Sequence, residues 1–186
     1  MKHIIIEGPD AVGKDLLISK LCSLSNNYIV RHFSNPIGNT NAEKINYQKI
    51  DFELEFKLAQ TAQNFFCKNH LPELLIWNRS HIGEYVYGQM YRNYDPSWIF
   101  DLEQKYNLDD VYLILMYGDP RFLIGKDDGE SISNKVENRA KEINLFFEAF
   151  EQTHIKNKQS IKVNKNNEYL PISTIHTIAL DFLKIK

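Results

Sequence analysis

The fold is decided by the stretch His3-Ile4-Ile5-Ile6-Glu7-Gly8-Pro9-Asp10-Ala11-Val12-Gly13-Lys14-Asp15, in which an apolar run leads into the pattern G-x-x-x-x-G-K. Residues 4–6 are wholly apolar, as expected for a strand buried in a parallel sheet. Glycines at both ends of the loop permit backbone angles that side chains forbid, so successive N–H groups can point inward at phosphate oxygens. The pattern therefore predicts a strand, a phosphate-binding loop and a helix, in this order.

The end of this loop supplies charge and donors for a phosphate chain. The N-terminus of the following helix carries a positive dipole end, and Lys14 adds a mobile charge for the outer phosphates. Apolar residues at positions 16, 17, 18 and 21 then recur at helical spacing. We assign phosphate-chain binding to Gly8, Ala11, Val12, Gly13, Lys14, Asp15 and Leu16.

The last position of the motif departs from the usual form. Asp15 stands where Ser or Thr would normally hold a magnesium ion. A carboxylate is itself an oxygen ligand for this ion. An acid is equally favourable at a helix N-terminus, where it can act as a cap. Asp15 is therefore a candidate magnesium ligand or a helix cap, and both interpretations stay open.

Length and composition are those of an ordinary globular protein. The chain has 186 residues, of which 43% are hydrophobic and 25% charged, enough to bury a core. A net charge of −2 gives no reason to expect a nucleic-acid partner. Two cysteines make no disulfide framework, and no long apolar run predicts a membrane span. We expect a cytoplasmic protein with no membrane partner.

Strand-like and helix-like segments alternate along the rest of the chain. Short apolar runs predict strands at 28–33, 74–77, 111–116 and 160–163. Apolar residues at helical spacing predict helices at 51–68, 136–150 and 171–183. Strands separated by helices pair in parallel. We predict one domain over residues 1–186: a three-layer α/β fold with about five parallel strands, flanking helices and a short lid at about 120–140.

A polar triplet, Asn78-Arg79-Ser80, follows the third predicted strand. Ligands of such sheets bind at the carboxyl ends of the strands, so the triplet should lie beside the phosphate loop. Arg79 can bind phosphate oxygens in bidentate fashion and offset charge that develops during transfer. Glu84 could accept a hydrogen bond from a ligand hydroxyl, act on magnesium through water, or be a solvated helix residue. These three interpretations stay open.

The chain resembles the thymidylate kinase family of P-loop nucleoside and nucleoside-monophosphate kinases over nearly its whole length. Five features carry the resemblance in order: the opening Ile5–Asp10, the triplet Asn78-Arg79-Ser80 in place of D-R-[YH], Tyr87, Asp119-Pro120, and Glu137-Asn138-Arg139 followed by Phe146-Phe147. The resemblance implies a P-loop kinase fold, ATP as phosphoryl donor and Mg²⁺ as cofactor. It also implies small-molecule nucleotides as partners and is compatible with a homodimer.

The resemblance further implies roles for single residues. Asp10 would contact the acceptor sugar or phosphate, Arg79 would touch both phosphates, and Tyr87 would lie near the acceptor base. Arg139 would close over the transferred phosphate from the lid. The catalytic set so assigned is Lys14, Arg79, Arg139 and Glu84, and the loop residues already assigned to the phosphate chain would bind ATP.

The chain departs from the family pattern around the metal and the acceptor. Asn78 replaces the usual aspartate. The arginine expected after the second strand is missing, and Arg31 is the nearest basic residue. Thr61 replaces a base-reading arginine, which leaves the amides of Gln60 and Gln63 as candidates. The acceptor site so assigned is Asp10, Arg31, Phe56, Gln60, Gln63, Arg79 and Tyr87.

The favoured function is ATP-dependent phosphoryl transfer to a (deoxy)nucleoside monophosphate, whose phosphate oxygen is already anionic and needs no base. A hydroxyl acceptor benefits from a general base, which Asn78 cannot supply. The alternative is therefore a (deoxy)nucleoside kinase, or a kinase of a hydroxyl on a modified nucleobase, including one in DNA, with Glu84 as base. A degenerate kinase that binds nucleotide without turnover is the non-enzyme alternative.

Overall fold

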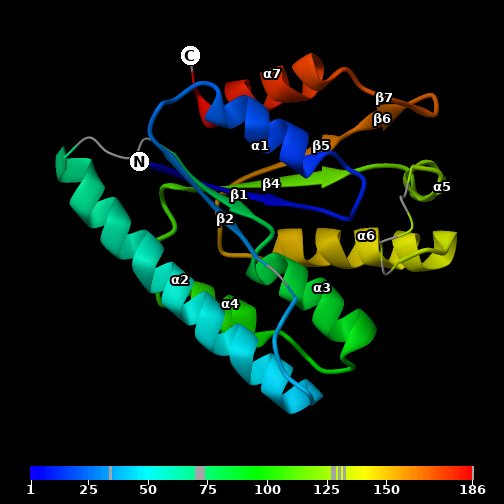
Figure 1. Cartoon of the computed structure of the whole chain (residues 1–186), viewed down its shortest axis with the longest axis horizontal. Coiled ribbons are helices and arrows are strands. Elements are labelled where there is room, and N and C mark those ends of the chain that lie inside the picture. Colours follow the sequence, from blue (N-terminus) through cyan, green and yellow to red (C-terminus); the bar gives the residue numbers. More distant parts are fainter. Residues whose placement is uncertain (34, 70–73, 127–128, 130, 132, 186) are drawn as a thin grey trace.

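A five-stranded parallel sheet forms the centre of the molecule (Figure 1). The computed structural model describes residues 1–33, 35–69, 74–126, 129, 131 and 133–185, with the backbone alone at 66–69. The strand order is β2-β3-β1-β4-β5, and every neighbouring pair is parallel. The five strands are β1 (Lys2–Glu7), β2 (Tyr28–His32), β3 (Leu74–Asn78), β4 (Val111–Tyr117) and β5 (Asn157–Lys162).

Helices cover both faces of this sheet, with α1 and α7 on one face and α2, α3, α4 and α6 on the other (Figure 1). The short helix α5 follows the carboxyl end of β4. The helices are α1 (Lys14–Cys22), α2 (Asn41–Asn69), α3 (His81–Tyr91), α4 (Trp98–Glu103), α5 (Pro120–Ile124), α6 (Val136–Gln152) and α7 (Ile172–Leu183). The predicted three-layer α/β fold with five parallel strands is confirmed.

The central strand β1 shows how the sequence builds the two layers. Its side chains alternate between the faces, so Ile4 and Ile6 join the core under α1 and α7 while Ile5 joins the core under α2, α3 and α6. All three isoleucines have no exposed surface. A strand buried on both faces reads as a continuous apolar run, and this run is what made β1 recognisable from sequence.

The helix α2 begins ten residues before the predicted start at residue 51. Its N-terminus is a capping box: the Thr40 hydroxyl accepts a hydrogen bond from the Glu43 N–H, and the Glu43 carboxylate accepts from the Thr40 N–H. The sequence carries this signal as Thr40-x-x-Glu43. The missed turns place Gln48 and Phe52 on the helix, and both become important below.

A second difference is a small hairpin between β5 and α7, built from β6 (Asn164–Lys165) and β7 (Glu168–Tyr169). Its two-residue turn is Asn166-Asn167, and both residues have positive φ, at 54° and 61°. Asparagine tolerates this left-handed conformation, which two-residue hairpin turns require. The sequence pattern predicts neither a strand nor a helix between residues 163 and 171.

The predicted lid at about 120–140 contains α5 and the start of α6, and its residues 127, 128, 130 and 132 lie outside the described residues. Within the described part of the chain, no helix has both the length and the apolar character to cross a membrane. The single domain over residues 1–186 stays a prediction.

Candidate active site

The loop between β1 and α1 is held against the neighbouring strand β4. Gly8 has φ 137°, and a Cβ at this position would lie 2.0 Å from the carbonyl oxygen of Met116. No side chain fits there, and φ in this range favours glycine. The first glycine of the motif is therefore required for the close approach of loop and sheet.

The loop backbone leaves its donors available. Ala11 and Gly13 have φ 65° and 80°, so the chain turns through left-handed positions of the kind that form anion-binding nests. Among the described residues, none accepts a hydrogen bond from the N–H groups of Ala11, Val12 or Gly13. A pocket opens beside Ala11 and Gly13, which we call the loop pocket, and Val12 is not among its lining residues. It is lined by Asp10, Ala11, Gly13, Lys14, Asp15, Leu16, Asn78 and Arg79.

Lys14 lies folded over its own loop. Its Nζ donates to the carbonyl oxygens of Gly8 and Pro9, at 2.8 and 2.7 Å, and the side chain is buried. Burial and the nearby Arg79 guanidinium lower the pKa of Lys14 to about 8, and the carboxylates of Asp10, Glu7 and Glu142 oppose this shift. Phosphate oxygens in the loop pocket could replace the two carbonyls as acceptors.

The two departures from the family pattern are in direct contact. Asn78 Nδ2 donates to Asp15 Oδ1 at 2.7 Å and lies 2.9 Å from His32 Nδ1. A carboxylate only accepts, so the amide nitrogen of Asn78 must face Asp15, and its second proton faces His32. His32 Nδ1 is then the acceptor and its proton is on Nε2. Asp15 makes no capping bond to its own helix, whose N-cap Gly13 has no side-chain cap.

Arg79 lies at the point where the strand ends meet. Its backbone has φ 67°, uncommon for a residue with a side chain, and its N–H donates to the Ile6 carbonyl at 3.0 Å. The guanidinium donates to Asp10 Oδ1 at 2.6 Å. A left-handed arginine held by a neighbouring strand is the kind of local strain that accompanies functional sites. Asp10 and Arg79 are thus brought together, as predicted.

Beneath the loop, Glu7 is buried and ties β1 to the start of α3. Its Oε1 accepts from the Ser80 hydroxyl at 2.8 Å and from the Gly83 N–H at 3.0 Å, while Oε2 has no partner among the described residues. Burial raises the pKa of Glu7, and the contacts with Ser80, Lys14 and Gly83 act in the opposite direction. Sequence analysis gave Glu7 no role; the signal was a charged residue closing an apolar strand.

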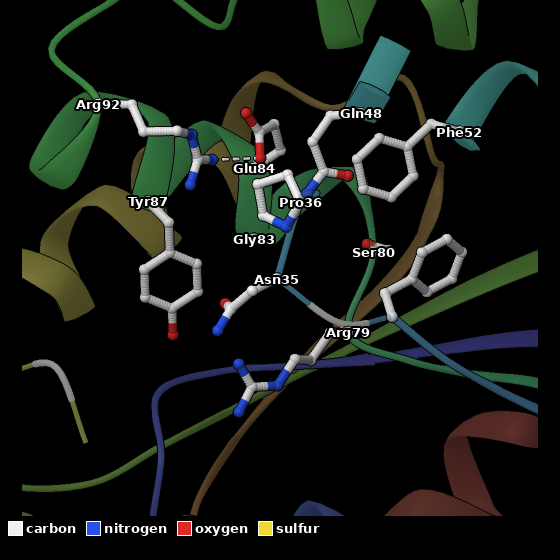
Figure 2. A pocket seen from close by; sticks show the side chains of 11 residues that line it. Asn35, Pro36, Gln48, Phe52, Arg79, Ser80, Gly83, Glu84, Tyr87 and Arg92 are labelled. Carbon is white, nitrogen blue, oxygen red and sulfur yellow. Dashed lines mark hydrogen bonds and ion pairs between the residues drawn. The ribbon is translucent and has the colours of Figure 1, made fainter. Parts of the chain in front are cut away.

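A second pocket lies between the loop after β2 and the helices α2 and α3 (Figure 2). We call it the α2–α3 pocket. Its lining combines aromatic side chains with polar and charged ones, and such polar groups can orient a bound small molecule. Its lining residues are Phe33, Asn35, Pro36, Gln48, Phe52, Arg79, Ser80, Gly83, Glu84, Tyr87 and Arg92.

The polar groups of this pocket differ in how they are bonded. The carboxylate of Glu84 is buried and accepts from the Arg92 guanidinium and the Tyr94 hydroxyl. This excludes the solvated interpretation of Glu84. Gln48 is only 5% exposed, and no described residue hydrogen-bonds to its amide. Since an amide both donates and accepts, the Gln48 side chain could hydrogen-bond to a ligand in this pocket.

Tyr87 and Arg139 meet through a carboxylate that sequence analysis did not single out. The Tyr87 hydroxyl donates to Glu142 Oε1 at 2.8 Å, and Arg139 Nη1 donates to Glu142 Oε2 at 2.9 Å. Arg139 has no exposed surface. Burial raises the pKa of Tyr87 well above its usual value, so the hydroxyl is a donor at neutral pH. Tyr87 lines the α2–α3 pocket, whereas Arg139 is not among the lining residues of either pocket.

Four residues assigned to the acceptor lie outside both pockets. Arg31 forms ion pairs with Asp51 and Glu55 of α2 at 3.1 and 2.8 Å. Phe56 packs in the core against Trp77, with ring centroids 5.1 Å apart. Gln63 donates to Asp110, and Gln60 is half-buried outside the pocket linings.

Gln60 and Gln63 lie far from the α2–α3 pocket because α2 is long. Gln60 and Gln63 lie 12 and 15 residues beyond Gln48, so at 1.5 Å per residue they are about 18 and 22 Å further along the helix. Phe52 lies one turn before Phe56 on α2 and lines the α2–α3 pocket in its place. Asn35 and Arg92 were not assigned to the site from sequence, and Ser80 was named in the triplet without a role of its own; their signal is their position after strand ends or at a helix end.

Comparison with known proteins supports the fold. No family model matches the chain, and no curated protein sequence matches it. Three similar solved structures are the YorR protein from Bacillus subtilis in complex with phosphorylated GDP, the thymidylate kinase from Candida albicans and the thymidylate kinase from Ehrlichia chaffeensis.

All three structures match along nearly their full length. Their sequence identities are 15%, 15% and 14%, and their TM-scores are 0.62, 0.57 and 0.56. The matches cover 96%, 98% and 98% of this chain and 96%, 92% and 98% of the other chains. The chain therefore has the fold of the thymidylate kinase-like P-loop kinases.

Proposed function

We propose that the protein transfers the γ-phosphoryl group of ATP to a (deoxy)nucleoside monophosphate. One observation carries this proposal: Arg79 lines both the loop pocket and the α2–α3 pocket. A single guanidinium can therefore contact phosphates that enter from either side. Phosphoryl transfer depends on positioning and positive charge between donor and acceptor, which is what this junction supplies.

In this proposal the loop pocket binds the triphosphate of ATP and the α2–α3 pocket binds the acceptor nucleoside. An acceptor phosphate oxygen forms a bond to the γ-phosphorus, the bond from the γ-phosphorus to the bridging oxygen breaks, and ADP leaves with that electron pair. Lys14 and Arg79 offset the charge on the phosphates. The lid role of Arg139 and a direct role of Glu84 remain predictions.

The donor set of the loop pocket fits a magnesium ion. No cluster of three or more His, Cys, Asp or Glu side chains suited to a metal exists among the described residues. Magnesium in kinases is held by one or two carboxylates together with substrate phosphates, so no such cluster is needed. Asp15 lines the pocket, and Asn78 Oδ1 is a buried oxygen without a partner among the described residues. When bound, the ion would neutralise charge on the phosphates.

The similar structures agree with a nucleotide substrate. Two of them are thymidylate kinases, and the YorR protein holds phosphorylated GDP. The acceptor base of this chain is not implied by these names, because the residues that line its α2–α3 pocket include Gln48 and Asn35 rather than the expected arginines.

One observation favours a hydroxyl acceptor as the second candidate. The guanidinium of Arg31 is occupied by Asp51 and Glu55, so it offers no charge to an acceptor phosphate. In the described lining of the α2–α3 pocket, Arg79 and Arg92 are the basic residues, and Arg92 is paired with Glu84. A nucleoside acceptor would need less positive charge there.

The test is ADP release from ATP and Mg²⁺ with a panel of nucleoside monophosphates, nucleosides and single-stranded DNA that carries hydroxymethylated bases. We expect stimulation by one or more monophosphates, and stimulation by nucleosides or by the DNA would establish the alternatives instead. Lys14→Ala should abolish release, and Lys20→Ala, an exposed lysine on the same helix, should not. ATP binding without stimulation by any acceptor would disprove the kinase proposal and indicate a nucleotide-binding protein without turnover.

A further inference from the structure

The hairpin β6–β7 reaches the phosphate loop from the other end of the chain. The Tyr169 hydroxyl donates to the carbonyl oxygen of Ala11 at 2.6 Å, a contact between residues 158 positions apart. The Tyr169 ring packs edge-on against Phe122 of α5, with centroids 4.7 Å apart. Tyr169 therefore connects three segments: the loop after β1, the hairpin after β5 and the helix that opens the lid region.

This hydrogen bond determines how one loop peptide is oriented. In a planar trans peptide the C=O and N–H groups point in opposite directions. Because the Ala11 carbonyl points at Tyr169, the Val12 N–H points away from the hairpin. That N–H has no acceptor among the described residues. The contact thus turns this donor away from the hairpin, in the segment between Ala11 and Gly13, which both line the loop pocket.

The backbone of Ala11 is also strained. Ala11 has φ 65°, a left-handed conformation that costs a residue with a Cβ about 1–2 kcal/mol. Rotation of Ala11 to a negative φ would relieve this cost and turn the Ala11–Val12 peptide. A hydrogen bond to the Ala11 carbonyl opposes that rotation with a similar free energy, about 0.5–1.5 kcal/mol.

Tyr169 is well placed to exert this effect. Its backbone lies next to a two-residue turn, and its ring is fixed against the buried Phe122. Partial burial raises the pKa of the Tyr169 hydroxyl, so it remains a donor at neutral pH. The side chain itself is 43% exposed, so removal of its hydroxyl leaves the core intact.

We propose that Tyr169 is a positioning residue for the phosphate-binding loop, which holds the strained Ala11 in the conformation that presents the Val12 N–H to the nucleotide's phosphates. The inference rests on the proposed function, because it takes the loop pocket to be the phosphate site. It adds a residue that no part of the phosphate-loop motif contains.

The experiment measures binding of inorganic tripolyphosphate and of ADP by calorimetry. The variants are Tyr169→Phe, Ala11→Gly and their combination, with Tyr28→Phe as control because Tyr28 is equally exposed, at 47%, on the distant edge strand β2. Tyr169→Phe should weaken binding of both ligands about three- to tenfold, the equivalent of one hydrogen bond. Thermal unfolding of each variant checks that the fold is retained.

The Ala11→Gly variant tests whether Tyr169 acts by holding Ala11 in its strained conformation. Glycine adopts positive φ without strain, so in Ala11→Gly the further change Tyr169→Phe should cost less than about twofold. Equal affinity of Tyr169→Phe and wild type would overturn the inference, as would an equal loss in both backgrounds. Loss for ADP alone would mean that Tyr169 contacts the nucleoside instead. If the wild type binds neither ligand, the phosphate-site assignment itself fails.

Discussion

Lys14 is the residue whose ionisation should control nucleotide binding. Its pKa is lowered to about 8, first by burial and then by Arg79. Below this pH the ammonium is charged and attracts phosphate; above it the neutral amine does not. We expect ADP affinity to be nearly constant from pH 7 to 8 and to fall by up to about tenfold per unit above pH 8. Phosphate groups, with a second pKa of about 6, do not titrate there.

Calorimetric titrations from pH 7 to 9.5 provide the measurement. Lys14→Gln serves as the comparison, since it should bind ADP weakly at every pH and lose the dependence. A wild-type affinity that stays flat up to pH 9.5 would show that Lys14 keeps its proton and that burial does not control it.

Asp15 and Asn78 are expected to behave as one unit, because the amide of Asn78 donates to the Asp15 carboxylate at 2.7 Å. The single change Asn78→Asp would put two carboxylates at hydrogen-bonding distance, where they repel each other. The double change Asp15→Ser with Asn78→Asp restores one hydroxyl and one carboxylate. A divalent cation relieves this repulsion and gains a ligand, so we predict that Asn78→Asp tightens Mn²⁺ binding in the presence of ADP about tenfold, and that the double variant, which again has one carboxylate, loses most of this gain.

Electron paramagnetic resonance of Mn²⁺ measures this binding independently of turnover. Asp101→Ala is the control, since Asp101 is also an exposed acid in the first turn of a helix, α4, outside both pockets. Additive effects of the two changes would separate the residues, because sites that act together show coupling. If Asp15→Ala binds Mn²⁺ as tightly as wild type, Asp15 is not a ligand of the ion and acts only through its favourable interaction with the helix dipole.

At the scale of elements, the N-terminal half of α2 should read the acceptor. Gln48 faces the α2–α3 pocket with an unbonded amide, whereas Gln60 lies about 18 Å further along the same helix. Gln48→Met keeps the volume but loses donor and acceptor, so the Michaelis constant of the best acceptor should rise about five- to twentyfold. Gln60→Met should leave it unchanged. A rise with Gln60→Met alone would restore the assignment made from sequence.

The elements differ in how far sequence could predict them. The strands were recognisable because buried parallel strands such as residues 4–6 are apolar throughout. The start of α2 was missed because residues 41–50 lack an apolar period, although Thr40 and Glu43 form a capping box. The hairpin at 164–169 was missed because its strands have two residues each.

The site was predictable as far as its motif extends. Lys14, Asp10 and Arg79 follow strand ends, so the strand order places them together, as the structure confirms for Asp10 and Arg79. Gln60, Gln63 and Phe56 were placed on a helix whose predicted start was ten residues late, and they lie outside the pocket linings. Contacts such as Tyr169 to Ala11 depend on side-chain conformation and tertiary packing, which no local pattern encodes.

At the scale of the whole molecule, the exposed apolar side chains of α2 bear on the predicted homodimer. Along α2, Ile50, Leu54, Leu58 and Phe65 are more than half exposed, while Phe52 and Phe56 face the core. The homodimer therefore stays a prediction, which sedimentation at several concentrations would test. The cytoplasmic location stays a prediction as well.

At the scale of the whole fold, His3 should make the protein sensitive to acid. It lies in the central strand β1, is 3% exposed and packs edge-on against Trp77 with ring centroids 4.3 Å apart. Burial, with a smaller effect of His81, lowers the pKa of His3 to about 3. The unfolded chain has a histidine pKa of about 6.5, so between pH 6.5 and 3 only the unfolded state takes up this proton.

The stability contributed by neutral His3 is therefore fully present above pH 6.5 and is lost as the pH falls toward 3. The expected loss between pH 7.5 and 5 is about 2 kcal/mol in the free energy of unfolding. Urea unfolding at the two pH values, compared between wild type and His3→Phe, isolates this contribution, because the other titrating groups are common to both proteins. The variant should lose about 2 kcal/mol less than wild type on acidification, even if it is less stable at both pH values. Equal losses would mean that His3 accepts its proton inside the folded sheet, and that the acid sensitivity of the fold originates elsewhere.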